Sequence, residues 1–227
     1  ALDYQDMEYS TSGVPADQYF LQDFMALPDV ERYKIVVFNN AYHLSEAERN
    51  FVNRLKSNGR TLIWQYAAGY LSERGLSTTS MNELTGIKIE TAFAPQRQRA
   101  LAVTSADPLA KNLLPQQGMD DTFRTQFRLD TDDFAFDAQR FWIDDPQAVP
   151  LARYSADDKT AIAVRRFNDW TSIYVAPLAG ISGELLHNAA TSAGAFTSNA
   201  PGKLITNLND RFLSLHALQS GTYDITL

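Results

Sequence analysis

Tyr33-Lys-Ile-Val-Val-Phe38, Ser45-Glu-Ala-Glu48 and Thr61-Leu-Ile-Trp64 form the stretch of sequence that decides the fold. The two apolar runs are typical of strands that are buried on both faces, as in a parallel sheet. Ser45 and Glu48 have the spacing of a capping box, and Asn58-Gly59 ends the helix that the box begins. A strand, a helix and a second strand in this order predict a right-handed βαβ unit.

The turn after the second strand reads Gln65-Tyr66-Ala67-Ala68-Gly69-Tyr70. An α/β enzyme often carries its nucleophile at such a turn. This turn has no Cys, Ser or His, and the whole chain has no cysteine, which excludes disulfides, thiolate metal sites and a Cys nucleophile. The sequence therefore predicts the frame of an α/β enzyme without a catalytic group at the usual place.

The rest of the chain adds helices and a β-rich region to this unit. Ser80-Met-Asn-Glu83 is a second capping box, and residues 182–190 have a helical pattern. Short alternating runs between Asp-rich turns predict an antiparallel β meander at about 120–176. Further strands are expected at 87–90, 100–103, 204–208 and 211–216, and those of the meander at 123–127, 134–136, 141–143, 151–154, 161–164 and 171–175. Without repeats or low-complexity linkers, the simplest organisation is one domain over residues 1–227, with the β-rich insertion inside it.

Composition narrows the classes of function. The chain has 227 residues, of which 44% are hydrophobic and 21% charged, as in a folded globule. Its net charge of −7 repels a phosphate backbone, so we expect no nucleic-acid partner. No run of about 18 apolar residues is present, so we expect no membrane span. Because residues 1–5 match neither a signal peptide nor a Met start, we expect a processed chain or a piece of a longer protein. The cellular compartment is left open.

Metal and acid–base chemistry have weak support in the sequence. His43, His187 and His216 lack metal-ligand spacing, and no glycine-rich phosphate loop is present, so we expect no metal and no cofactor. A pair of carboxylates could hydrolyse glycosides, and Arg165-Arg166 could be a basic edge. Neighbouring strand residues point to opposite faces, however, so we interpret these side chains as solvated turn and edge residues. The acid pairs are 120–121, 132–133, 144–145 and 157–158.

A ligand crevice is expected where the two predicted strands end. In open α/β sheets, ligands bind beyond the carboxyl ends of the strands. The candidate residues there are Asn39, Asn40 and Tyr42 after the first strand, and Gln65, Tyr66 and Tyr70 after the second. Aromatic faces and amides side by side suit a sugar, because rings stack on C–H groups and amides bond hydroxyls. The alternative is that the two asparagines cap backbone groups and the tyrosines cover the end of the sheet.

Four stretches of the chain resemble one family of domains. They are Tyr33–Arg49, Asn58–Tyr70, Met81–Ile87 and Asn209–Ala217, and the likeness extends from about residue 15 to residue 227. They are similar to the class I glutamine-amidotransferase-like domain that is appended to bacterial glycoside hydrolases, also called the β-galactosidase trimerisation domain. The resemblance implies an α/β fold, a flavodoxin-like three-layer sandwich with a parallel core sheet, to which the antiparallel β meander is added. The family's first strand would precede residues 15–26, although residues 1–13 do not have a strand pattern.

The resemblance also implies a function. Working amidotransferases of this fold need a Cys with His and Glu partners, whereas this chain has Ala67 and Ala68 near the turn, so glutaminase activity should be absent and no catalytic residue is carried over. The implied role is that of a non-catalytic accessory or oligomerisation domain of a carbohydrate-active enzyme of β-galactosidase type. Its partner would be the catalytic TIM-barrel domain of a parent chain, or further copies of itself. The alternatives are a carbohydrate-binding module that uses the edge of the sheet, and an independent glycoside hydrolase.

Overall fold

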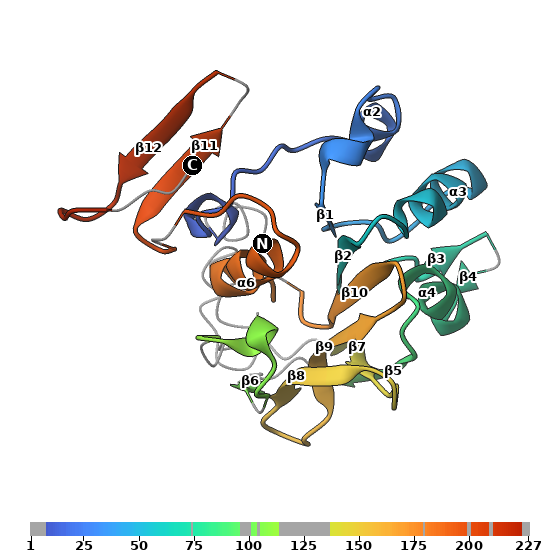
Figure 1. Ribbon diagram of the computed structural model, residues 1–227. Helices are drawn as coiled ribbons and strands as arrows, with labels where there is room; N and C mark the ends of the chain where they lie inside the picture. The colour runs from blue at the N-terminus through green and yellow to red at the C-terminus, as the bar shows by residue number, and fades with distance from the viewer. Residues whose placement is uncertain are drawn as a thin grey trace.

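A mixed sheet of eight strands lies at the centre of the molecule, with helices on both sides of it (Figure 1). The computed structural model describes residues 8–73, 75–95, 101–103, 105–113, 137–178, 180–198, 201–208 and 211–223. After a short helix at 8–11, the elements are α2 (Leu21–Met25), η1 (Val30–Arg32), β1 (Ile35–Phe38), α3 (Glu46–Leu55), β2 (Arg60–Gln65), β3 (Leu71–Ser72), β4 (Gly75–Leu76), α4 (Thr78–Thr85), β5 (Ile89–Pro95), β6 (Leu101–Val103), η2 (Pro108–Ala110), β7 (Asp137–Ile143), β8 (Val149–Tyr154), β9 (Thr160–Arg166), β10 (Trp170–Val175), α6 (Gly183–Ser192), β11 (Leu204–Leu208) and β12 (Leu213–Ala217).

The predicted βαβ unit is present. β1 and β2 pair in parallel, and α3 connects them. The predicted capping box begins α3: the backbone N–H of Glu48 donates to Ser45 Oγ at 3.3 Å, and the N–H of Ser45 donates to Glu48 Oε2 at 2.7 Å. All six residues of β2 are buried, as expected of a strand covered on both faces. β1 is only partly buried, because it pairs with β2 alone and forms one edge of the described sheet.

One predicted strand of the meander belongs to the parallel part of the sheet. β10 lies between β2 and β9 and runs parallel to β2, with Ile173 opposite Ile63. We expected residues 171–175 in the added antiparallel region, and this placement corrects that expectation. The physical reason is that the last four residues of β10 are buried, as is typical of a strand in a parallel sheet, and the chain reaches β2 through the antiparallel β9–β10 hairpin.

The antiparallel part of the sheet divides beside β9. β8 pairs with residues 160–164 of β9. β7 pairs with β9 through its last residue, Ile143, which lies opposite Thr160, the first residue of β9. β6 then adds to β8, and β5 adds to β7. The predicted strands at 141–143, 151–154 and 161–164 lie within β7, β8 and β9, and those at 87–90 and 100–103 overlap β5 and β6. The predicted strands at 123–127 and 134–136 lie outside the described residues.

The second capping box is wrong, although the helix itself is present. Ser77 is the N-cap of α4, and its Oγ accepts the N–H of Ser80 at 3.1 Å, so that Ser80 lies inside the helix. The short β3–β4 hairpin delivers the chain to the helix three residues earlier than the sequence pattern indicated. Gly86 ends α4 in the left-handed conformation (φ +71°), which glycine adopts without steric cost.

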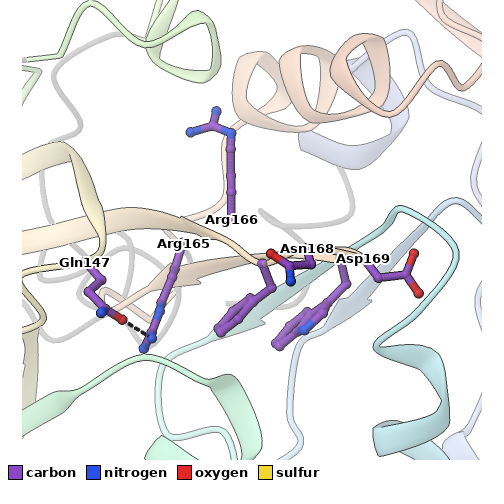
Figure 2. Close-up of a pocket in the computed structure, with 7 residues that line it drawn as sticks. Gln147, Arg165, Arg166, Asn168 and Asp169 are labelled. Atoms are coloured by element: carbon purple, nitrogen blue, oxygen red, sulfur yellow. Dashed lines mark hydrogen bonds between the residues drawn. The ribbon is translucent and has the colours of Figure 1, made fainter.

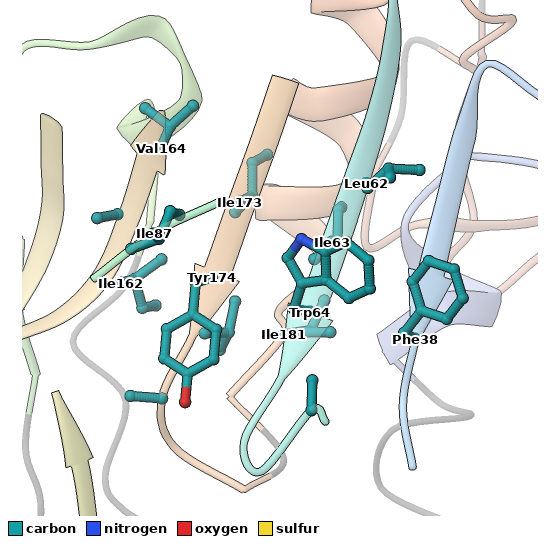
Figure 3. Close-up of a cluster of buried hydrophobic side chains, with 14 of the residues drawn as sticks. Phe38, Leu62, Ile63, Trp64, Ile87, Ile162, Val164, Ile173, Tyr174 and Ile181 are labelled. Carbon is teal, nitrogen blue, oxygen red and sulfur yellow. The ribbon is translucent and has the colours of Figure 1, made fainter. Parts of the chain in front are cut away.

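Trp64 is the centre of the buried core (Figure 3). Its ring stacks on Phe38 with the centroids 4.5 Å apart, and its Nε1 donates to Ser172 Oγ at 3.0 Å. Ser172 Oγ in turn donates to the carbonyl of Thr85 at 2.6 Å, at the end of α4. These hydrogen bonds satisfy buried polar groups that would otherwise cost free energy, and they join β2, β10 and α4. Figure 1 shows α3 and α4 on one side of these strands and α6 on the other.

The predicted hairpin near the C-terminal end is also present. β11 and β12 pair antiparallel, with Thr206 opposite Leu215, and they stand apart from the main sheet (Figure 1). Residues 209–210, between the two strands, and residues 224–227 lie outside the described residues. No helix in the described part of the chain is long and apolar enough to span a membrane.

Candidate functional site

The turn after β2 has a strained backbone at Tyr66. This residue has a φ of +53°, a conformation that costs a non-glycine residue roughly 1 kcal/mol. Two hydrogen bonds to β10 hold it there: the Tyr66 N–H donates to the Val175 carbonyl at 2.8 Å, and the Tyr174 hydroxyl donates to the Tyr66 carbonyl at 2.5 Å. In α/β hydrolases, a strained turn of this kind presents the nucleophile. Here the same position carries a tyrosine.

The side chain of Tyr66 is engaged in packing. Its hydroxyl donates to the carbonyl of Gln139 on β7 at 2.7 Å. Its ring meets Phe141 edge to face at 5.1 Å and Tyr42 at 6.2 Å, while Tyr70 meets Phe141 in the same way at 5.0 Å. Burial raises the pKa of Tyr42 and of Tyr70, so both phenols are neutral at physiological pH. The rings therefore pack against one another and cover the end of the sheet.

The three amides of the predicted crevice do not converge on one point. Asn39 accepts a hydrogen bond from Tyr9 of the helical segment at 8–11. Asn40 is exposed, and its Oδ1 accepts the Tyr42 hydroxyl at 3.2 Å. Gln65 is buried within β2. The structure thus brings Tyr42, Tyr66 and Tyr70 together around Phe141 and leaves Asn40 beside Tyr42, and this arrangement agrees better with the covering role that the sequence also allowed.

The turn leaves no space for a reactive side chain next to Tyr66. Ala67 and Ala68 are buried, and a Cβ atom added to Gly69 would lie 2.8 Å from Leu84 Cδ2 of α4. In the described residues, no group of three His, Asp or Glu side chains could hold a metal ion. The carboxyl edge of the sheet is therefore closed by tightly packed groups, among them the Arg49 guanidinium, which donates to the Gly69 carbonyl at 3.3 Å.

The acid pairs that the structure describes form ion pairs. Asp144 accepts from Lys88 Nζ at 2.6 Å, and Asp145 accepts from Arg165 at 3.0 Å. Asp157 is held by two hydrogen bonds from Arg140, both 2.7 Å long, which lower the pKa of its carboxyl. The side chain of Asp145 is only 4% exposed, so its interpretation as a solvated turn acid is wrong, because Arg165 and the Lys88 N–H compensate its burial. The pairs at 120–121 and 132–133 lie outside the described residues.

An open hollow of about 510 Å³ lies at the opposite, amino end of β10 (Figure 2). No pattern in the sequence indicated this hollow. Arg165 and Arg166 leave β9 in opposite directions, as Figure 2 shows, and Arg166 donates to both oxygens of Asp107 at 2.9 and 3.0 Å. Both arginines form ion pairs, and Arg166 is exposed, as expected of a solvated edge, whereas Arg165 is half-buried. The hollow is lined by Gln147, Arg165, Arg166, Phe167, Asn168, Asp169 and Trp170.

Two aromatic rings in this hollow are covered on their outer faces. Phe167 and Trp170 stack in parallel, with centroids 4.3 Å apart and planes inclined by 1°. The Arg165 guanidinium lies 4.8 Å from the Phe167 centroid, and the Lys56 ammonium lies 5.4 Å from the Trp170 centroid. Since the stacked rings leave no space between them, each cation lies on an outer face. A sugar ring would have to displace a cation to stack here.

No protein-family model matches the chain, and neither does any curated protein sequence. Similar solved structures include a β-galactosidase from Bacillus circulans sp. alkalophilus, with 18% identity and a TM-score of 0.61 over 93% of this chain. They also include a cold-adapted β-galactosidase from Rahnella sp. R3 (14%, 0.65, 90%) and a GH42 β-galactosidase from G. stearothermophilus (16%, 0.53, 84%). The chain spans only 30%, 29% and 24% of the length of these three proteins. It shares the fold of one segment of each.

Proposed function

We propose that this chain is a non-catalytic accessory domain of a carbohydrate-active enzyme of β-galactosidase type. The observation that carries the proposal is the fold likeness, which covers nearly the whole of this chain but less than a third of each β-galactosidase. A chain that matches one segment of a larger enzyme is well suited to work beside the rest of that enzyme. The proposal includes the finer assignment to a flavodoxin-like, glutamine-amidotransferase-like domain of the trimerisation type.

The closed turn after β2 supports a role in which the domain itself catalyses no reaction. Tyr66 occupies the strained position, its hydroxyl donates to a backbone carbonyl, and Ala67 and Ala68 are buried beside it. A tyrosine in this bonding state is a poor nucleophile, and no base is positioned to activate it among the neighbours described above. The domain would therefore act through protein contacts, either with a catalytic TIM-barrel domain of a parent chain or with further copies of itself.

The test combines an activity assay with a measurement of assembly. The purified chain should release no chromophore from a panel of aryl glycosides and no ammonia from glutamine, and light scattering should show a closed oligomer or a complex with the barrel domain encoded in the same gene. Aryl-glycoside hydrolysis that a single Asp→Asn change abolishes would replace this proposal with the independent hydrolase. A strictly monomeric chain whose gene encodes no barrel would also contradict it.

Carbohydrate binding at the carboxyl edge is the second candidate. The exposed Asn40 next to the half-buried Tyr42 offers an amide and an aromatic side chain together. The other candidate residues are buried, hydrogen-bonded to the protein or packed against another ring; they are Asn39, Gln65, Tyr66 and Tyr70. Titration with galactose and with galacto-oligosaccharides, followed by tryptophan fluorescence, tests this candidate. A saturable signal that Tyr42→Ala or Tyr66→Ala abolishes, and that Tyr19→Ala at a distant exposed tyrosine preserves, would establish it. A flat titration would eliminate it without affecting the accessory-domain proposal.

A further inference from the structure

Asn58 and Gly59 lie in the turn that connects α3 to β2, and they are the only Asn-Gly pair in the chain. Both residues are exposed and have positive φ angles, +60° and +68°. A Cβ atom built at Gly59 would have no heavy atom of a non-adjacent described residue within 4 Å. Because glycine has no Cβ, its backbone nitrogen can approach the side-chain amide of the preceding asparagine with little steric hindrance.

Two hydrogen bonds engage the groups that could react in this pair. The side-chain Nδ2 of Asn58 donates to Glu31 Oε2 of η1 at 3.2 Å. The backbone N–H of Gly59 donates to the carbonyl of Asp169 at 2.8 Å, in the turn between β9 and β10 that borders the hollow of Figure 2. The amide and the nitrogen beside it are therefore bonded to two different segments of the fold.

We propose that Asn58 is a modification site, at which the chain loses ammonia and gains a carboxylate, and that the bonds to Glu31 and Asp169 restrain this reaction in the folded state. The Gly59 nitrogen gives up its proton and attacks Asn58 Cγ. The bond from Cγ to Nδ2 breaks, ammonia leaves with the proton, and a five-membered cyclic imide forms. One water molecule then opens the imide to aspartate or isoaspartate. The acid proton of the product passes to ammonia, so that atoms and charges balance.

Asn168 is the natural comparison for Asn58. It is also exposed, and it also lies in a tight turn, between β9 and β10. The residue after it is Asp169, whose Cβ hinders the attack of the backbone nitrogen, whereas Gly59 has none. Exposure in a turn is thus common to both asparagines, and the glycine separates them.

The modification would disturb contacts at the start of β2. Glu31 Oε2 also accepts from Arg60 at 2.6 Å, and the side chain of Arg60 is only 2% exposed. A carboxylate at residue 58 would face the like charge of Glu31 in place of the amide that now donates to it. Isoaspartate would also lengthen the backbone of the turn by one atom and shift Gly59 relative to Asp169. Both products should therefore lower the urea concentration at which the chain unfolds.

The experiment measures the rate of ammonia loss at each asparagine. The full chain is incubated at mildly alkaline pH, both folded and in concentrated urea, and peptide mass spectrometry follows the mass gain that accompanies deamidation. Asn58 should react before every other asparagine in both states, and Asn168 should lag behind it. The reaction at Asn58 should be about tenfold slower in the folded chain, because the hydrogen bonds to Glu31 and Asp169 must first open.

A pair of variants tests the restraint directly. Glu31→Ala removes the acceptor of the Asn58 amide, so the folded chain should react about threefold faster or more at Asn58. Asp29→Ala is the matched control, because Asp29 is the N-cap residue of the same short helix but pairs with Arg32 at 3.3 Å. Circular dichroism checks that both variants fold, and the comparison with urea needs neither of them.

Three results would overturn the proposal: another asparagine that reacts before Asn58, equal rates at Asn58 in the folded chain and in urea, or equal rates in the two folded variants. The outcome does not depend on the accessory-domain proposal.

Discussion

The two ends of the parallel strands β1, β2 and β10 are built from similar residues but in opposite ways. At the carboxyl end, Tyr66 and Tyr70 each meet Phe141 edge to face, Tyr42 meets Tyr66 in the same way, and hydroxyls donate to carbonyls. At the amino end, Phe167 and Trp170 stack flat between two cations. The end at which α/β enzymes carry out chemistry is closed by packed side chains, whereas an open hollow is found at the other end. Aromatic residues thus close one end of the sheet where they pack edge to face, and line an open hollow at the other end where they stack flat.

The largest effect is expected at the amino end, from Gly86→Ala. The added Cβ would lie 2.6 Å from Phe167 Cζ, and the stack with Trp170 prevents that ring from moving away. Together with the left-handed backbone (φ +71°), the substitution should lower the free energy of unfolding by about 3 kcal/mol. Gly59→Ala is the matched control, because Gly59 has a φ of +68° but no atom within 4 Å of the added Cβ, and it should cost about 1 kcal/mol. Equal losses in urea unfolding would show that the stack is not rigid.

At the carboxyl end, Tyr174→Phe should cost about 2 kcal/mol at pH 7, because the buried carbonyl of Tyr66 loses its donor. It should also change the dependence of stability on pH. Burial raises the pKa of Tyr174 above its ordinary value, so the folded chain keeps a proton that the unfolded chain loses above about pH 10. The free energy of unfolding is therefore complete below about pH 10 and falls by up to roughly 1.4 kcal/mol per pH unit above it. Urea unfolding at pH 8, 10 and 11 should show a smaller fall in the variant; an identical fall would contradict the assignment.

Tyr66→Phe should have a smaller effect, a loss of about 1 kcal/mol, because it removes only the hydroxyl that donates to Gln139. The ring contacts with Phe141 and Tyr42 are kept. Tyr19→Phe is the control and should cost less, because the hydrogen bond that it removes, between the hydroxyls of Tyr19 and Tyr33, is exposed to solvent. If Tyr66→Phe lowered the free energy of unfolding no more than Tyr19→Phe, the hydrogen bond from Tyr66 to Gln139 would not stabilise the turn after β2.

The smallest effect is expected from Lys56→Gln, with the opposite sign of pH dependence to Tyr174→Phe. The pKa of Lys56 is lowered to about 8 in the folded chain, so between about pH 8 and 10.4 the unfolded chain binds more protons at this residue. The stability of the unmodified chain therefore gains with rising pH in this window, by less than about 1 kcal/mol because solvent screens the partly exposed amine. The variant should lack this gain, whereas Lys203→Gln should keep it. A gain that persists in Lys56→Gln would assign the effect to another group.

The sequence predicted the elements whose signals are local. Ser45 and Glu48 form the expected capping box, and β2 is buried along its whole length because each of its residues faces packed layers. The second box failed because Ser77 and Ser80 both fit a cap, and only the preceding hairpin decides between them. The direction of β10 depends on its contact with β2, more than a hundred residues earlier in the chain, and no local pattern encodes it.

The candidate site was predictable to a smaller extent. The sequence placed Tyr42, Tyr66 and Tyr70 at one end of the sheet, since parallel strands end at a common edge. It could not show that the rings would meet around Phe141, which comes from β7. The stack at the amino end joins Lys56 to Arg165, Phe167 and Trp170 of the β9–β10 hairpin, and nothing in the spacing of these residues indicates cations on the ring faces. Pairwise contacts between distant segments were the missing information in both places.

The position of β10 has a consequence for how the chain folds. Trp64 and Ser172 are 108 residues apart in sequence, so β2 has no partner on that side until nearly all of the described sheet has been synthesised. A pairing of such long range forms slowly, because the entropic cost of closing the loop arises before the two strands gain any contact energy. During that delay, an apolar strand with an unpaired edge is available to other chains. Truncation before residue 170 should accordingly yield a chain that aggregates during translation rather than a smaller folded unit.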